Sequence, residues 1–209
     1  MTEKRWISVV ASGEALVAPD LAVVSFAVSG SGKQLAPMRD DVNARSSSVL
    51  ARLRELGVVD ADLKAPDVGI HPEYDYRKGQ RLTGYRVMRQ MTAKVRDLDR
   101  LGDVLDGLLA AGANEVHGAQ MSAADPSSAE HEALRAAVSA AKAKAQAVAD
   151  AGGVTLGELA RVEEEPSHAV PMPRTRMLAA AGAVAGAPTE VAAGDLTVTR
   201  QVRAWFAIE

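Results

Sequence analysis

The chain has 209 residues, of which 47% are hydrophobic but only 3% aromatic, so its core must be built mainly from small and branched aliphatic side chains. A formal net charge of −3 gives no basic excess for holding a phosphate backbone, which argues against nucleic acid as a partner. Because the chain has no cysteine, disulfide bonds, thiolate metal ligands and a cysteine nucleophile are excluded.

The first half of the chain predicts four strands and one long helix. Residues 34–56 carry apolar side chains at helical spacing, and Gly57 stands where a helix of this length is expected to end. The polar residues 77–80 predict the loop of a hairpin. Strict alternation in the strand after this loop predicts an antiparallel sheet with one exposed face. The strands are expected at 5–12, 20–29, 67–76 and 84–96.

The second half predicts two helices and three further strands. One helix is expected from Asp97 to about Ala111, followed by Gly112 in a left-handed conformation. Another is expected to run to about Ala151, with Asp125-Pro126 at its start. The apolar stripe of this last helix is expected to consist of Leu134, Val138, Ala141, Ala145 and Val148. The strands are expected at about 114–121, 159–165 and 195–208.

Residues 166–194 differ in composition from the rest of the chain. Four prolines and many alanines argue against a continuous strand or a long helix in this segment. Met172, Met177 and Leu178 give the segment apolar character, so we expect it to pack on a neighbouring subunit or a partner. The strands on either side of it are expected to pair with each other.

This order of elements predicts an α+β fold. We expect mostly antiparallel sheets with three helices packed on them, arranged as two α+β halves of about 1–97 and 98–209. The helices are too few and too unevenly placed for a doubly wound parallel sheet.

No motif in the sequence predicts a catalytic or metal site. Ser46, Ser47 and Ser48 lie in the middle of a predicted helix, and no Gly-x-Ser-x-Gly elbow occurs. We therefore expect no catalytic residues, no cofactor and no metal. The four histidines lack the spacing of a zinc site on one helix; they are His71, His117, His131 and His168.

All three tyrosines of the chain fall in the predicted hairpin. If its strands pair, Tyr74 and Tyr76 share one face and lie near Tyr85. A packing cluster is one interpretation, and an exposed aromatic patch at an oligomer interface is the other.

The sequence contains no candidate membrane span. No segment approaches the roughly 20 apolar residues that a spanning helix needs. The apolar run near the N-terminus is interrupted at Ser12, Gly13 and Glu14, which favours a strand over a secretory signal. We expect a cytoplasmic location for the chain as written, and a periplasmic or exported one if a leader has been removed.

A series of short motifs, taken in order, resembles the SIMPL (DUF541) family. The resemblance extends over about 13–165, and the whole chain is expected to be a single unit of this family, with 166–194 as a long Ala/Pro-rich loop. Ala65 departs from the threonine that is usual in the family at this point. The motifs occupy residues 13–22, 67–76, 84–86, 95–99, 112–118 and 142–157.

The resemblance implies ring-like homo-oligomers associated with tolerance of oxidative or envelope stress, and it supplies no catalytic residues. We therefore expect a non-enzymatic, self-assembling protein whose principal partner is itself. The alternative is a small-molecule or peptide binding module in a signalling pathway. The possible interface residues are Tyr74, Tyr76, Tyr85, Met172, Met177 and Leu178.

Overall fold

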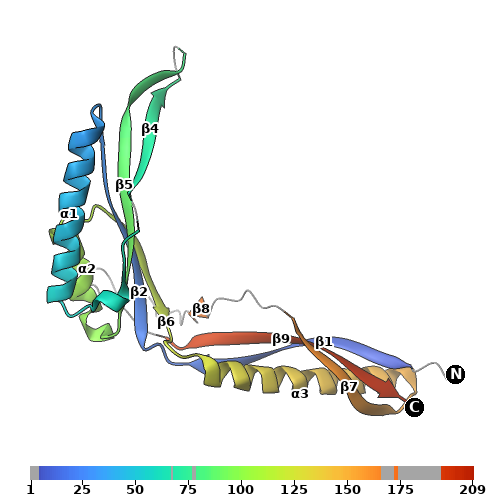
Figure 1. The fold of residues 1–209 in the computed structure, drawn as a ribbon. Helices are drawn as coiled ribbons and strands as arrows, with labels where there is room; N and C mark the ends of the chain where they lie inside the picture. The colour runs from blue at the N-terminus through green and yellow to red at the C-terminus, as the bar shows by residue number, and fades with distance from the viewer. Residues whose placement is uncertain (1–4, 67, 77–78, 166–171, 174–193) are drawn as a thin grey trace, which may run out of the picture. The chain divides into compact units, whose positions relative to one another are not determined.

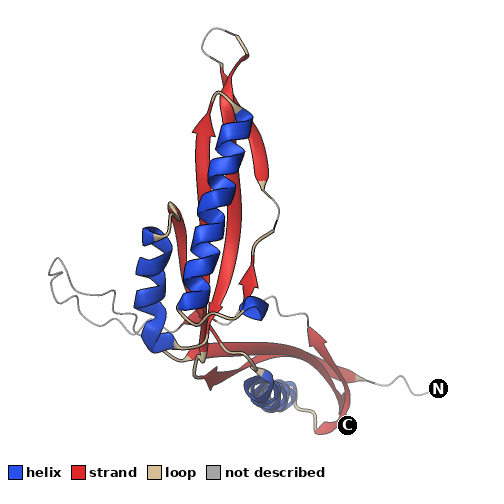
Figure 2. Ribbon diagram, turned by 60° about the vertical axis from the view of Figure 1, so that its left-hand side comes forward, coloured by secondary structure: helices blue, strands red, loops and turns tan. Residues whose placement is uncertain are grey.

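The computed structural model describes residues 5–66, 68–76, 79–165, 172–173 and 194–209 (Figures 1 and 2). The predicted α+β fold is confirmed, and the strand pairs in the described residues are antiparallel. The helices are α1 (Leu35–Glu55), α2 (Leu101–Ala110) and α3 (Ser127–Gly152), with 3-10 turns η1 (Asp60–Asp62) and η2 (Leu98–Arg100). The strands are β1 (Trp6–Val17), β2 (Leu21–Gly32), β3 (Leu63–Lys64), β4 (Gly69–Asp75), β5 (Arg81–Val95), β6 (Glu115–Ser122), β7 (Leu156–Glu165), β8 (Met172–Pro173) and β9 (Leu196–Ile208).

The strands belong to two sheets. One has the order β1-β9-β7, with β8 also paired to β9. The other has the order β3-β5-β2-β6, with β4 also paired to β5. The prediction that the strands flanking 166–194 pair with each other is confirmed by the β7–β9 ladder.

The chain divides into two compact units, and the boundaries in the described residues fall after Pro19 and after Ser122. The first unit holds β1, α3, β7 and β9, and the second holds the elements from β2 to β6. This differs from the expected division at residue 97. The physical reason is strand pairing, because β1 pairs with the last strand of the chain while β6 pairs back to β2.

In the second unit, α1 lies against one face of the β2–β5 part of the sheet (Figure 1). Val42, Val49 and Leu53 of α1 are buried, and one face of β5 is buried with them. The buried residues of β5 on this face are Val87, Met91, Ala93 and Val95. Gly112 follows α2 with φ of 113°, which confirms the positive φ expected there.

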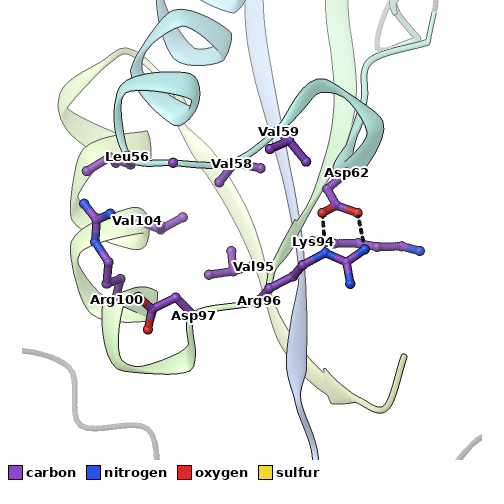
Figure 3. A pocket seen from close by; sticks show the side chains of 11 residues that line it. Leu56, Val58, Val59, Asp62, Lys94, Val95, Arg96, Asp97, Arg100 and Val104 are labelled. Atoms are coloured by element: carbon purple, nitrogen blue, oxygen red, sulfur yellow. Dashed lines mark hydrogen bonds and ion pairs between the residues drawn. The ribbon is translucent and has the colours of Figure 1, made fainter. Parts of the chain in front are cut away.

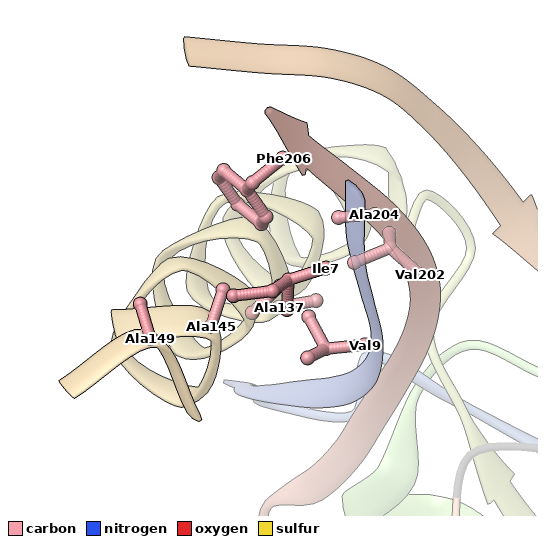
Figure 4. Packing of buried hydrophobic residues seen from close by; sticks show 9 residues of the cluster. Ile7, Val9, Ala137, Ala145, Ala149, Val202, Ala204 and Phe206 are labelled. Atoms are coloured by element: carbon pink, nitrogen blue, oxygen red, sulfur yellow. The ribbon is translucent and has the colours of Figure 1, made fainter. Parts of the chain in front are cut away.

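In the first unit, α3 covers one face of the β1–β9 pair, and its contact surface is almost entirely alanine. The buried residues recur at every fourth position, and we call them the alanine row (Figure 4). Ile7 and Val9 of β1 and Phe206 of β9 pack against it. The alanine row consists of Ala129, Ala133, Ala137, Ala141, Ala145 and Ala149.

The apolar stripe predicted for α3 was therefore only partly right. Ala141 and Ala145 are buried as expected, but Leu134 and Val138 are half-buried at one flank and Val148 is 47% exposed. The prediction favoured the larger aliphatic residues, because they gain more free energy on burial. In the structure, the side of the helix that faces the sheet instead carries small residues, because the helix lies very close to the sheet.

Gly13 sets this close approach. A Cβ atom at Gly13 would lie 2.2 Å from the backbone nitrogen of Ala137 and 2.3 Å from the carbonyl oxygen of Ala133. Both are backbone atoms of α3, so no side-chain rotation relieves the overlap. The strand and helix backbones therefore touch at this point, and only glycine fits.

We predict that Gly13→Ala destabilises the protein by about 1–3 kcal/mol or more, the usual cost of overpacking a tight core. Equilibrium urea unfolding followed by circular dichroism measures this. Gly152→Ala is the matched control, because a Cβ there meets its nearest atom, on Val154, at 3.9 Å and the residue is helical. Equal unfolding free energies for the wild-type protein and Gly13→Ala would contradict the close contact.

Candidate functional site

The β4–β5 hairpin continues beyond the end of helix α1 (Figures 1 and 2). Strand β2 leaves the sheet where Gly32 pairs with Tyr85, whereas β4 and β5 remain paired as far as Asp75 and Arg81. The far part of the hairpin is thus a two-stranded ribbon with no helix over it.

One face of the β4–β5 hairpin carries apolar side chains that are exposed. Ile70 pairs with Val87, so both lie on the face that α1 covers lower in the sheet. Tyr74 lies four residues further along β4 on the same face, opposite Leu82 after a bulge in β5. We call the exposed set the hairpin stripe. Its members are Ile70, Tyr74, Tyr76 and Leu82, and their exposed fractions run from 39% to 70%.

The structure brings two of the three tyrosines into contact. The ring centroids of Tyr74 and Tyr76 lie 6.2 Å apart, and the ring planes make an angle of 51°. Tyr85 is half-buried opposite Pro72 and takes no part in that ring pair. Of the other predicted interface residues, Met172 lies in β8, whose backbone pairs with Thr197, and Met177 and Leu178 lie outside the described residues.

A network of polar side chains joins β2, β6 and α1. The Asn114 side chain accepts a hydrogen bond from the Ser29 N–H at 2.8 Å and donates one to the Ser29 carbonyl at 3.0 Å, which extends the β2–β6 ladder beyond its last backbone pair. Arg45 also donates to the Ser29 carbonyl, at 2.9 Å. Asn114 belongs to the segment 112–118 that carried the family resemblance, so the sequence did mark this point.

Glu115 completes the network. Its carboxylate accepts hydrogen bonds from the Ser29 hydroxyl at 2.6 Å and from Arg86 at 2.8 Å. The bond from Ser29 is the largest influence and holds the pKa of Glu115 below the usual range, with Arg86 acting in the same direction against desolvation. Because two donors keep this carboxylate charged, it is suited to holding β2, β5 and β6 together and not to accepting protons at neutral pH.

A small cavity of about 140 Å³ lies in the second unit where α1, η1, α2 and the end of β5 meet (Figure 3). Val58, Val95 and Val104 give it apolar walls, while Arg96 and Arg100 stand at its rim. The cavity is about the size of one small apolar molecule.

A bidentate ion pair borders this cavity. Both oxygens of Asp62 accept hydrogen bonds from Arg96, at 2.7 and 2.9 Å, and Asp62 is only 6% exposed. The hydrogen bond from Arg96 lowers the pKa of Asp62 more than its burial raises it. Sequence reasoning missed this pair, since nothing in the pattern around residue 60 distinguishes Asp62 from an exposed loop residue.

A larger, open groove of about 840 Å³ lies in the first unit between α3 and the start of β7. Val138, Leu159 and Phe206 supply apolar surface. Arg135 and Lys142 of the helix line it together with Glu158 of the strand.

The serines and histidines considered in the sequence are not assembled into a site in the described part of the chain. Ser46 is fully buried in α1, and the Ser48 hydroxyl donates to the Ala44 carbonyl at 3.2 Å. His71, His117 and His131 are exposed on three different elements, β4, β6 and α3, and His168 lies outside the described residues. The described residues contain no group of three or more His, Asp or Glu side chains that could hold a metal ion.

Comparison with known proteins places the chain in a family. The family model SIMPL, described as a protein of unknown function (DUF541), matches residues 7–206. The chain belongs to the SIMPL family. The match extends the resemblance read from residues 13–165 across the last strand.

Several SIMPL relatives are similar over most of their length. The uncharacterized protein YggE of Edwardsiella ictaluri is 36% identical over 83% of this chain and 74% of the relative. A 26 kDa periplasmic immunogenic protein of Brucella melitensis is 32% identical over 86% of this chain and 76% of the relative. YggE of Escherichia coli K12 is 29% identical over 96% and 83%, respectively. Among the described helices of this SIMPL chain, none is both long and apolar enough to cross a membrane.

We predict that the Asp62–Arg96 pair stabilises the fold in a pH-dependent way. The folded pKa of Asp62 lies below its unfolded value near 3.9, so its stabilising contribution is present above about pH 4 and is lost as the pH falls through the folded value. Asp62→Asn should therefore lower the free energy of unfolding at pH 7, and the difference from the wild-type protein should shrink towards pH 3.

Urea unfolding at a series of pH values measures this difference. Asp60→Asn is the control, because the Asp60 carboxylate is 76% exposed in its ion pair with Arg54 and such surface pairs contribute little. A difference between Asp62→Asn and the wild-type protein that stayed constant from pH 7 to pH 3 would argue against a charged Asp62 as the cause.

Proposed function

We propose that this SIMPL protein acts by self-assembly into a homo-oligomer larger than a dimer, and not by catalysis. The observation that carries the proposal is the hairpin stripe. Its residues continue the face that is buried beneath α1, yet they are 39–70% exposed on a hairpin whose tip extends past the helix. Apolar surface gathered at one projecting place is typical of a contact with another protein.

The chemistry of the stripe favours a specific contact. Tyr74 and Tyr76 offer large, stiff rings with a polar hydroxyl, the residue type that contributes most often at the centre of interfaces. Ile70 and Leu82 add aliphatic surface on the same face. A second copy that covered this face would bury it as α1 buries the lower part of the sheet.

The absence of catalysis is also part of the proposal. The Ser46 hydroxyl is buried, so a substrate could reach it only if α1 moved away from the residues that cover it. The Ser48 hydroxyl donates a hydrogen bond to a carbonyl of its own helix. Glu115 and Asp62 are held charged by their donors, which suits structural roles better than proton transfer.

The groove between α3 and β7 supports a second candidate function, a small-molecule or peptide binding module. Its volume of about 840 Å³ falls in the range of ligand sites, and it combines apolar surface with cations and a carboxylate. A monomeric mass together with a raised melting temperature in a small-molecule and peptide thermal-shift screen would favour this function over assembly.

We also infer a link with tolerance of oxidative or envelope stress, which rests on the family resemblance. We infer a periplasmic or exported location as well, in line with the name of the Brucella relative. A strain without the protein should survive peroxide less well than its parent, and cell fractionation should find the protein outside the cytoplasm. Equal survival of both strains would remove the stress role without affecting assembly.

We predict that light scattering at micromolar concentration gives a mass above that of a dimer. The double variant Tyr76→Ser/Leu82→Ser should give a smaller assembly with an unchanged circular dichroism spectrum, because both side chains are exposed in the free subunit. His71→Ser is the matched control, since His71 lies opposite Arg86, on the other face of the same hairpin. A monomer mass across dilutions would contradict the proposal.

A further inference from the structure

Strand β1 has an open edge in the described structure. It is a twelve-residue strand that pairs with β9 on one side and ends the sheet on the other. The Ile208 N–H donates to the Arg5 carbonyl, and the register from Trp6 to Val17 is unbroken. Because backbone bonds alternate in an antiparallel pair, odd-numbered residues of β1 bond to β9, and Ser8, Val10 and Ser12 turn their N–H and C=O groups to the open edge.

One side chain of α3 reaches this edge. The Lys144 ammonium group donates a hydrogen bond of 3.0 Å to the carbonyl oxygen of Val10, one of the outward-facing groups. This contact identifies which flank of α3 lies above the open edge. The opposite flank, with Val138 and Lys142, lies over the groove beside β7.

The flank above the open edge carries a self-complementary pattern. Each of its residues stands one position before a buried alanine of the alanine row, and is therefore rotated by about 100° towards the edge. We call this set the outer ridge. It consists of Glu132, Ala136, Ala140 and Lys144, in that order along the helix. Glu132, Ala140 and Lys144 are exposed and Ala136 is half-buried.

The middle of the outer ridge is level with the middle of β1. Gly13 touches α3 between Ala133 and Ala137, while Val10 meets Lys144. The point between Ala136 and Ala140 therefore lies above the strand near Ser12. A two-fold axis through this point brings the open edge and the outer ridge of one copy onto the same features of another.

We propose that two copies of this chain join across this axis, with β1 pairing antiparallel to β1 of the second copy and Glu132 facing Lys144 of the second copy. The inference rests on the proposed self-assembly and names the surface through which copies meet. Ser12 then lies opposite Ser12 of the second copy, and the two sheets become one. The Val10 carbonyl gains a backbone donor, which releases Lys144 to bind Glu132 of the neighbour.

The small residues of the outer ridge make this arrangement sterically feasible. Helix α3 packs on both β1 and β9, so its axis lies inside the edge strand. Because paired strands lie about 4.8 Å apart, two such helices on either side of a β1–β1 pair come to lie roughly 8–10 Å apart, the separation of packed helices. Ala136 and Ala140 would meet at the centre, where larger side chains would hold the helices apart. The two symmetric Glu132–Lys144 pairs flank this centre and fix the register.

Charge exchange tests the proposal. Glu132→Lys and Lys144→Glu each place like charges opposite each other twice, and should raise the dissociation constant of the dimeric contact about tenfold or more. The double variant Glu132→Lys/Lys144→Glu restores opposite charges and should recover most of the affinity. Lys142→Glu, on the opposite flank of the same helix, is the control and should leave it unchanged. Sedimentation velocity over a dilution series measures all four variants beside the wild-type protein.

A second variant tests the strand pairing. The Ser12 N–H faces the open edge, so Ser12→Pro removes no β1–β9 hydrogen bond and is compatible with an edge strand. Folded Ser12→Pro, verified by circular dichroism, should lose the dimeric contact. If Ser12→Pro fails to fold, the charge variants decide.

The outcomes separate this inference from the proposed function. If the wild-type protein forms its large assembly but the single charge variants associate as tightly as it does, the β1 contact is overturned and self-assembly stands. If the wild-type protein is a dimer that the single variants weaken and the double variant restores, the β1 contact stands and the larger assembly is overturned. A wild-type monomer at all concentrations overturns both.

Discussion

The contact between Gly13 and the backbone of α3 is the constraint on which the first unit depends. Gly13 has no side chain, and the side of α3 that faces the sheet consists of six alanines, so α3 packs directly against β1. The resulting core has few large side chains, so its stability depends on close fit more than on the area that any one residue buries. Ile7, Val9 and Phe206 fill the space beside the row (Figure 4).

The same close approach has a consequence for association. Because α3 lies low over β1, Lys144 reaches a backbone carbonyl at the open edge, and the outer ridge stands beside that edge instead of above the middle of the sheet. In the second unit, the helix does not reach the exposed surface. The β4–β5 hairpin extends past the N-terminal end of α1, and Tyr74 and Tyr76 are left uncovered. One surface is polar, backbone-rich and self-complementary, and the other is aromatic. An isologous contact alone stops at a dimer, so a second, different contact would let the assembly grow larger.

Much of this fold could be predicted from the sequence, because antiparallel sheets with one wet face alternate clearly, as β5 does from Val87 to Val95. The hairpin that carries Tyr74 and Tyr76 followed from the polar loop between two alternating segments. The face of α3 could not be predicted, since hydrophobicity ranks Leu134 and Val148 above alanine, and only the long-range contact with Gly13 reverses that order. The outer ridge was missed for the same reason. Its position depends on which flank of the helix meets the strand edge, and local periodicity does not contain that information.

The most direct test of this account is residue-resolved amide hydrogen exchange along β1 at low and high protein concentration. Inward-facing amides such as Val9 should exchange slowly at both concentrations, because they bond to β9. The outward-facing amides of Ser8, Val10 and Ser12 should exchange quickly at low concentration and become protected as copies associate. If these amides exchanged equally fast at both concentrations while light scattering showed the assembly to be present, the open edge would not be a contact surface.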